Sequence, residues 1–428
     1  MFKIGKYKTL ATAAAAMAAA FVPQFATAQS DAQILDALVS KGLLEKAEAD
    51  DLKKGMAEIP VVETPTDTFL RISGKMQSQY EYIYADCTDG AVADSSASVS
   101  KFIIRRMILT FNSDNKRDWG TQLSFDFILP NQMSVTYLWK RVDCNFVKGE
   151  FRFGYVKPNF CFEENMSPFK LYCVERSVAT YYWGGPRKGS ARKLGFASFM
   201  TGAFWYGESR EIRGLKYAFA ATNSDNYKVG YESISDGSDN APNVWASSSY
   251  ATDIGGVKTT FGLNLGWGSA ANKTGRYCAT AMYGANPYIT LDWGALRTYA
   301  EFIITQADGA KCLDGSYDSQ LPFGLNYMVE YKFDIGEFGK IGPAFRFSYL
   351  DTDGRGVSPS DVIRQSVNVS GDTPYLRVKS FYFGLNWYIR GDNLKVQSGY
   401  EYAHFDGGVG GAHGLDVNWF RTQVQVLF

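Results

Sequence analysis

The chain has 428 residues, and its 44 lysines and arginines balance 44 aspartates and glutamates, so its formal net charge is zero. This balance argues against a nucleic-acid-binding protein, which would carry a basic excess. Aromatic residues make up 15% of the chain and glycine contributes 42 residues, which suits a large β protein whose apolar residues are dispersed by alternation. A β pattern that runs for about 360 residues is too long for one ordinary soluble domain.

The first 28 residues have the three parts of a secretory signal peptide. Lys3, Lys6 and Lys8 form a basic start, ATAAAAMAAAFV forms a short apolar stretch, and small residues precede Gln29. We place the cleavage site after Ala28. The apolar stretch is shorter and richer in alanine than the roughly 20 strongly apolar residues of a membrane-spanning anchor, so we expect the mature chain to be exported.

Residues 29–58 differ from everything that follows. They are rich in Ala, Leu, Lys and Glu, and their leucines recur at helical spacing. Gly42 suits a C-cap between two short helices. We therefore predict a short periplasmic α-helical segment at 29–58, followed by an extended linker at 59–68.

From residue 69 onward, apolar and polar residues alternate, as expected when successive side chains point to opposite faces of a strand. In the stretch FLRISGKMQSQYEYIY, Tyr80 and Tyr82 share one face, and Gln77, Gln79 and Glu81 share the other. Trp and Tyr collect near the strand ends, as in the aromatic girdles of membrane barrels. The closing stretch DVNWFRTQVQVLF has the same alternation and ends on Phe428.

Short turns alternate with long loops along residues 69–428, which is typical of an outer-membrane barrel. The predicted strands begin near residues 69, 101, 119, 132, 149, 192, 211, 243, 257, 284, 295, 321, 340, 379, 393 and 417. We therefore predict an all-β transmembrane barrel of 16 antiparallel strands at 69–428, with both ends on the periplasmic side. A β-sandwich is the alternative, but it gives no reason for aromatics to recur at strand ends.

The terminal strand is expected to close the barrel against the first strand. Its aromatic end resembles the C-terminal signal that outer-membrane barrels present to the barrel assembly machinery. The predicted partners are therefore outer-membrane lipid and this machinery, the latter through the strand that ends at Phe428.

Six cysteines lie in the exported part of the chain, where disulfides can persist. None shows a CxxC or Cys/His spacing, so no metal site is predicted. We expect Cys161 to pair with Cys173, twelve residues away in one loop, and more weakly Cys278 with Cys312. Free thiols are the alternative.

Several stretches together resemble the phosphate-selective porin family of the porin O and P type. They are FIIRRMILTF, GEFRFGYVKPNF, VERSVATYY and RKLGF, followed by YMVEYKFD, FRFSYLDTDGR, FGLNWYIRGDNLKVQSGYEY and TQVQVLF. The likeness covers about residues 69–428, and it implies 16 strands, a third loop folded into the pore and a homotrimer. By the same resemblance, Arg105, Arg106 and Lys157 would form a substrate-binding anion site at the constriction.

Strand parity complicates this site, because adjacent residues face opposite sides of a strand. One of Arg105 and Arg106 should point outward unless a bulge intervenes, and the strand must end or twist at Lys157. Arginine suits phosphate because its planar fork donates two parallel hydrogen bonds. The alternative is that these charges reach toward the membrane interface or pair with acidic side chains.

The polar face of the predicted strands would line a water-filled pore. Its basic residues are Arg71, Lys75, Arg152, Lys216, Arg297, Lys332, Arg346, Lys395 and Arg421. Its acidic residues are Glu81, Asp126, Glu150, Glu301, Glu330 and Glu401. Nine basic residues against six acidic ones predict a moderate preference for anions.

We thus predict a porin of the bacterial outer membrane that lets small solutes diffuse passively and favours anions such as phosphate. Alternatives are a general or sugar-permeable porin, with Tyr299, Tyr382 and Tyr388 as a sugar track, or a structural protein tethered through residues 29–58. No enzyme activity, catalytic residue or cofactor is predicted, since His404 and His413 lack a nucleophile motif.

Overall fold

A computed structural model describes residues 62–63, 68–87, 96–115, 118–128, 133–144, 147–184, 193–197, 199–223, 242–269, 281–363, 373–408 and 414–428. The predicted signal peptide, the predicted helical segment at 29–58 and most of the predicted linker lie outside these residues. The chain divides into two compact units, one of Met1–Ile72 with Phe111–Gly120 and one of Ser73–Thr110 with Thr121–Phe428. In the smaller unit, Val62 of β1 pairs antiparallel with Leu70 of β2.

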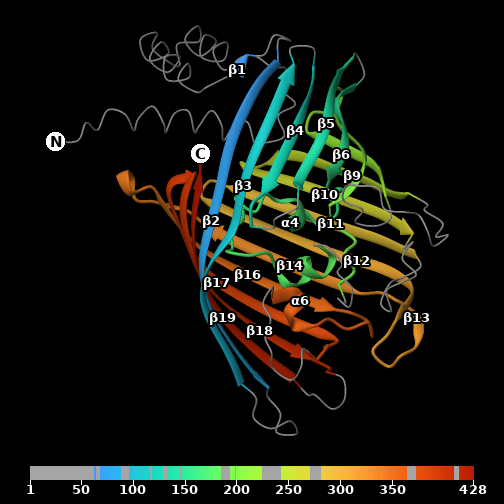
Figure 1. The fold of residues 1–428 in the computed structure, drawn as a ribbon, viewed down its shortest axis with the longest axis vertical. Coiled ribbons are helices and arrows are strands. Elements are labelled where there is room, and N and C mark those ends of the chain that lie inside the picture. Colours follow the sequence, from blue (N-terminus) through green and yellow to red (C-terminus); the bar gives the residue numbers. More distant parts are fainter. Residues whose placement is uncertain are drawn as a thin grey trace. The chain divides into compact units, whose positions relative to one another are not determined.

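Sixteen long antiparallel strands account for most of the described residues (Figure 1). They are β2 (Thr68–Cys87), β3 (Ser96–Asn115), β4 (Trp119–Asp126), β5 (Met133–Asp143), β6 (Val147–Val156), β7 (Met200–Ser209), β8 (Leu215–Thr222), β9 (Asn243–Ile254), β10 (Val257–Ser269), β11 (Ala281–Trp293), β12 (Leu296–Lys311), β14 (Phe323–Tyr331), β16 (Lys340–Asp351), β17 (Arg377–Asp392), β18 (Leu394–Asp406) and β19 (Gly414–Leu427). Three short strands accompany them: β1 (Val62–Glu63), β13 (Tyr317–Gln320) and β15 (Phe333–Asp334). The described helices are α4 (Phe162–Asn165), α5 (Val178–Trp183), α6 (Pro359–Ile363) and the 3₁₀ turn η1 (Gly336–Phe338).

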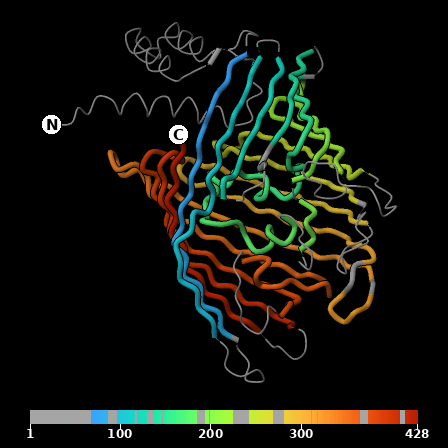
Figure 2. The backbone as a smooth tube through the Cα atoms, in the orientation of Figure 1, coloured from blue at the N-terminus to red at the C-terminus, as the bar shows by residue number. Residues whose placement is uncertain are grey.

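The strands form one sheet that closes on itself, because β9 pairs with β10 and β19 pairs with β2 (Figure 2). This confirms the predicted 16-stranded antiparallel barrel. Fifteen strands begin within five residues of the predicted position, but the sixth begins at Met200 rather than near 192. None of the described helices is long and apolar enough to span a membrane.

The last residue seals the junction between the final strand and the first long strand. The backbone N–H of Gly74 donates to the carbonyl of Phe428 at 2.6 Å, and the N–H of Phe428 donates back at 2.9 Å. A Cβ on Gly74 would lie 2.2 Å from the Phe428 ring, so a larger residue there would push the ring aside. The terminal strand therefore closes the barrel as predicted.

Strand alternation separates an exposed apolar face from a buried polar face. On β10, Phe261, Leu263 and Leu265 are 40–47% exposed, whereas Asn264 between them is buried. The apolar side chains cover the outside of the barrel, and the polar ones face its interior.

The main hydrophobic core lies inside the ring of strands. It joins Phe160, Trp183 and Phe196 from the loop after β6 to Val362 near the end of α6. Inward-facing glycines make room for these rings: a Cβ on Gly284 of β11 would lie 2.4 Å from Phe196 and 2.6 Å from Phe160. Two loop segments therefore fill part of the lumen.

The expected disulfide between Cys161 and Cys173 is wrong. Both are free, buried thiols that belong to different hydrophobic clusters. Burial raises the pKa of both thiols, so they stay neutral and pack as small apolar side chains. Cys278 lies outside the described residues, so its expected pairing with Cys312 stays a prediction.

Candidate pore constriction

The loop after β6 folds into the barrel, as the resemblance implied. We call residues 157–184 and 193–197 the inserted loop. Almost every side chain between Pro158 and Gly184 is buried or half-buried. The loop carries α4 and α5, and the Ser177 side chain caps α5 by accepting from the N–H of Thr180.

A buried guanidinium joins the inserted loop to the opposite wall. Arg346 of β16 is 0% exposed and donates to both carboxylate oxygens of Glu401 on β18, each at 3.0 Å. Its other terminal nitrogen donates to Glu163 of the loop at 3.2 Å and to the backbone carbonyl of Glu175 at 2.6 Å. Arg346 was predicted to line the pore, but it lies beneath the loop and bridges two acids.

The buried carboxylate of Glu301 holds the start of α4. The Glu301 carboxylate on β12 accepts from the backbone N–H of Phe162 at 2.8 Å. The side-chain amides of Asn286 and Asn326 donate to it at 3.1 and 3.0 Å. Glu301 therefore anchors the loop rather than lining open water.

A ladder of amide side chains fixes the middle of the loop against β18, β19 and β2. Gln77 donates to Gln425 at 2.8 Å, and Gln79 donates to Gln423 at 2.7 Å. Gln425 also donates to the carbonyl of Phe169 at 3.0 Å. These bonds satisfy backbone carbonyls that irregular loop structure would otherwise leave unpaired inside the protein.

Both predicted arginines of β3 point into the barrel. Exposed positions shift from even to odd between Ile104 and Met107, so one extra residue enters there as in a β-bulge. Arg105 Nε donates to Glu175 at 2.5 Å, and Arg106 Nη2 lies 3.5 Å from the other Glu175 oxygen. The bulge removes the parity problem, and a loop carboxylate neutralises part of the paired charge.

Lys157 follows directly after the end of β6. Its ammonium contacts the Glu164 carboxylate and donates to the Glu164 backbone carbonyl at 3.3 Å. β6 therefore ends directly before Lys157, as the alternation of its side chains required. The three residues predicted for the anion site are thus each ion-paired with a glutamate of the inserted loop.

Acidic residues of the wall are buried more often than basic ones. Among the nine predicted basic residues, three are buried, which leaves six at least partly exposed: Arg71, Lys75, Arg152, Lys216, Arg297 and Lys332. Among the six predicted acidic residues, four are buried, namely Glu81, Glu301, Glu330 and Glu401. Only Asp126 and Glu150 remain partly exposed. The accessible part of the predicted lining therefore has six basic residues against two acidic ones, a larger basic excess than the nine against six of the whole lining.

Arg152 stands out among the accessible residues. Its guanidinium lies 4.8 Å from the ring centroid of Tyr137 and 4.5 Å from that of Tyr206, with Glu150 at 2.6 Å from its Nε. Stacked aromatic faces hold a guanidinium in place while leaving its edge able to donate. This arrangement puts an ordered cation on the wall formed by β5, β6 and β7.

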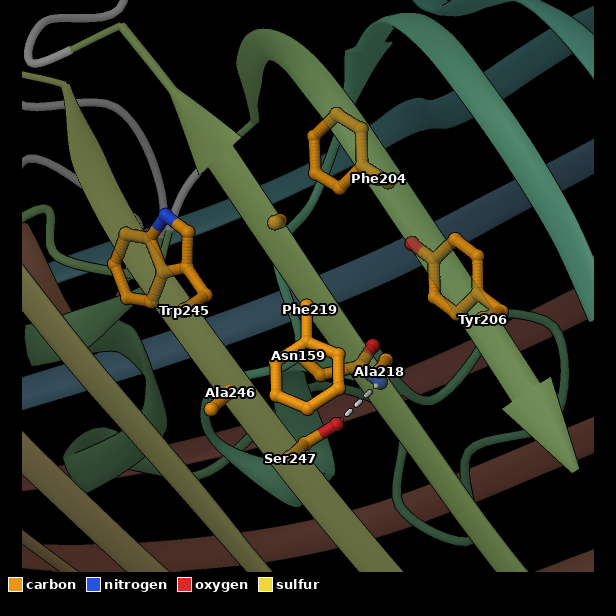
Figure 3. A pocket seen from close by; sticks show the side chains of 9 residues that line it. Asn159, Phe204, Tyr206, Ala218, Phe219, Trp245, Ala246 and Ser247 are labelled. Atoms are coloured by element: carbon orange, nitrogen blue, oxygen red, sulfur yellow. Dashed lines mark hydrogen bonds between the residues drawn. The ribbon is translucent and has the colours of Figure 1, made fainter. Parts of the chain in front are cut away.

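Near this wall, Asn159 of the loop donates to Ser247 of β9 at 3.0 Å (Figure 3). The cavity beside this pair, lined by Phe204, Tyr206 and Trp245, holds only about 10 Å³. It is too small for a solute, so the loop packs closely here. Within the described residues, no group of three or more His, Cys, Asp or Glu side chains could hold a metal ion.

Glu163 makes the loop anchor sensitive to acid. Burial opposes its ionisation, but Arg346 and donors at Ser177 and Thr180 outweigh burial and hold the pKa of Glu163 below its ordinary value. Because the folded pKa is the lower one, its contribution to stability is present above about pH 4.3 and is lost as pH falls through the folded pKa. We expect the difference in thermal midpoint between wild type and Glu163→Gln to shrink as the pH falls below about 4.

The control for this measurement is Glu337→Gln, which changes an exposed acid of η1. A Glu163→Gln difference that stayed constant down to pH 3 would contradict the depressed pKa.

The loop glutamates were not among the predicted site residues. Glu163, Glu164 and Glu175 sit in a segment without periodic pattern, so parity could not assign them a direction. The glycines on the polar side of the strands, such as Gly284 and Gly324, were the available sequence signal for a loop packed inside the barrel. Each faces an aromatic ring of the inserted loop.

The fold is similar to that of solved outer-membrane channels at low sequence identity. The outer membrane channel DcaP of Acinetobacter baumannii matches with a TM-score of 0.51 and 12% identity, over 86% of this chain and 99% of that one. OmpF of Salmonella typhi, in complex with daunomycin, matches with a TM-score of 0.51 and 12% identity, over 85% and 99%. The anion-selective porin from Comamonas acidovorans matches with a TM-score of 0.51 and 10% identity, over 84% and 100%.

This likeness confirms the porin-type barrel fold. The prediction of an outer-membrane location agrees with it. The likeness does not distinguish a phosphate-selective type. No protein-family model and no curated protein sequence matches the chain.

Proposed function

We propose that the chain forms a water-filled channel in the bacterial outer membrane, through which small solutes diffuse passively with a moderate preference for anions such as phosphate. The observation that carries the anion preference is the unequal burial of wall charges. Six predicted basic residues stay accessible against two acidic ones. An excess of fixed positive charge raises the local concentration of anions in a pore.

Arg105, Arg106 and Lys157 are the proposed anion-binding residues at the constriction. They are half-buried or buried, and each is paired with a loop carboxylate. A phosphate would compete with Glu175 and Glu164 for these donors, which supports weak binding and fast passage rather than tight capture.

The remaining parts of the proposal concern delivery and assembly. Residues 1–28 act as a signal peptide, residues 29–58 form a periplasmic helical segment, and the strand ending at Phe428 is recognised by the barrel assembly machinery. The chain assembles as a homotrimer. A sugar track is disfavoured, because Tyr299, Tyr382 and Tyr388 are at most 5% exposed.

Reversal potentials in a planar bilayer under a KCl gradient test the selectivity. Wild type is expected to favour chloride, and added phosphate is expected to reduce the chloride current. Arg105→Gln with Arg106→Gln removes two charges, so the ratio of anion to cation permeability should fall by roughly sevenfold or more, from about 0.6 kcal/mol per charge at about 7 Å in water.

Lys140→Gln is the control, because Lys140 is an exposed residue between the apolar positions of β5. A cation-selective wild type would overturn the anion preference and leave a general porin. An absence of conductance would overturn the channel and favour a tethered structural protein.

A further inference from the structure

The inward side of β5, β6 and β7 is less covered than the wall that anchors the inserted loop. The side chains of Arg152 and Glu150 are 28% and 19% exposed, whereas Arg346 and Glu401 beneath the loop are at most 2% exposed. The loop anchors described above lie on other strands, including β3, β12 and β19. A solute that passes beside the loop therefore meets the wall of β5–β7.

Cross-strand register arranges this wall in rows. Trp139 of β5 lies opposite Arg152 of β6. In the adjacent row, Glu150 of β6 lies between Arg141 of β5 and Tyr206 of β7. We call the following partly exposed residues the aromatic–arginine cluster: Tyr137, Trp139, Arg141, Glu150, Arg152 and Tyr206.

Aromatic rings order both guanidiniums of this cluster. The Arg141 guanidinium carbon lies 4.6 Å from the Trp139 ring centroid, and Arg152 contacts the rings of Tyr137 and Tyr206 as described above. A guanidinium held against a ring keeps its charge and loses little further freedom when it binds a ligand. The two terminal nitrogens of Arg152 are the donors that one carboxylate would engage side by side.

Glu150 limits the negative charge that the cluster accepts. Its carboxylate accepts from Nε of Arg152 at 2.6 Å and lies opposite Arg141 in the register. Two positive charges and one negative charge leave a formal net charge of +1 on these three residues. A compact dianion such as hydrogen phosphate would lie close to Glu150 and be repelled, whereas a single carboxylate balances the charge.

The rings of Tyr137, Trp139 and Tyr206 surround these donors with aromatic surface, and each ring is partly exposed. A ligand with an apolar body gains free energy by leaving water against such rings, and an aromatic body adds ring-to-ring contact. Chloride and phosphate have no apolar surface to offer. The rings therefore favour an organic anion with an aromatic body.

We propose that the aromatic–arginine cluster binds aromatic monocarboxylates. The carboxylate pairs with Arg152, and the aromatic body packs against Trp139 and the tyrosine rings. This site differs from the proposed anion site at the constriction, whose cations pair with glutamates of the inserted loop. Because the ligand reaches the cluster through the lumen, the inference rests on the proposed channel function and names a substrate class for it.

Saturation-transfer NMR with the purified full chain in detergent tests the site without requiring conductance, and benzoate is the probe. Wild type should bind benzoate saturably and benzamide, its uncharged analogue, about tenfold more weakly or less. Arg152→Gln should raise the apparent Kd for benzoate about tenfold or more, because it removes a charge-assisted bond. Lys148→Gln is the matched control, since it removes a cation from the same side of β6 and should change this Kd by less than about twofold.

Two further variants test the ring and the charge separately. Trp139→Leu keeps every charge of the cluster and should raise the apparent Kd for benzoate by roughly threefold or more, from lost ring contact. It also serves as the test if Arg152→Gln does not fold. Glu150→Gln should let phosphate displace benzoate more readily than it does from wild type, because the repelling charge is gone.

Benzoate bound no more tightly than benzamide would overturn the site. Equal affinity for benzoate in wild type, Arg152→Gln and Trp139→Leu would overturn it as well. A wild type that conducts ions and does not bind benzoate would overturn this inference alone. Benzoate binding that responds to the variants in a protein that never conducts would overturn the channel alone.

Discussion

Arg346→Met is expected to destabilise the barrel by about 3–5 kcal/mol, because it leaves two buried carboxylates without their shared cation. Glu401 and Glu163 are at most 2% exposed, and Arg346 binds both. The variant also loses the bond that holds the Glu175 carbonyl of the inserted loop. Denaturant unfolding measures the loss of stability, and single-channel recording should show a larger and noisier conductance.

The triple variant Arg346→Met, Glu163→Gln and Glu401→Gln is the control for the cause of this loss. It removes all three charges together, so most of the stability should return, as for buried ion networks replaced as a whole. Arg297→Met serves as a second control, since Arg297 is exposed and should change stability by less than about 1 kcal/mol. Equal stability of wild type and Arg346→Met would mean that Arg346 does not anchor the loop.

The barrel could be predicted because lipid and water impose a period of two on every strand. The strand predicted to begin near residue 192 begins at Met200 instead, and this difference shows the limit of the rule. Leu194 and Phe196 alternate with polar or small neighbours, but they pack inside the inserted loop at 1% exposure. Alternation records that a side chain is buried, and it does not say whether lipid or a neighbouring loop buries it.

The charged site was harder to predict, because its geometry depends on a loop without regular structure. Parity placed Arg346 inside the barrel correctly but could not reveal Glu163 beneath it. The alternation rule also could not predict that Arg105 and Arg106 lie on the same side of the strand, since a β-bulge leaves no pattern in one sequence. Tertiary contacts of the inserted loop therefore decide which predicted lining residues remain accessible.

Glu175→Gln is expected to raise anion selectivity. Glu175 is 3% exposed and contacts both paired arginines, so it offsets one unit of their charge. The variant keeps the shape of the side chain, and Tyr181 can still donate to its carbonyl oxygen. An anion that passes about 7 Å from the released charge in water gains about 0.6 kcal/mol, which corresponds to a roughly threefold higher permeability ratio.

Reversal potentials under a KCl gradient measure this ratio. The control is a double variant in which the net charge at the constriction is the same as in the wild type. Adding Arg105→Gln to Glu175→Gln restores the wild-type net charge at the constriction, so selectivity should return toward the wild-type value. Glu337→Gln, an exposed acid of η1, should leave selectivity unchanged. An unchanged ratio in Glu175→Gln would mean that permeating ions do not approach the paired arginines, and the basic wall around Arg152 and Lys216 would then have to carry the anion preference.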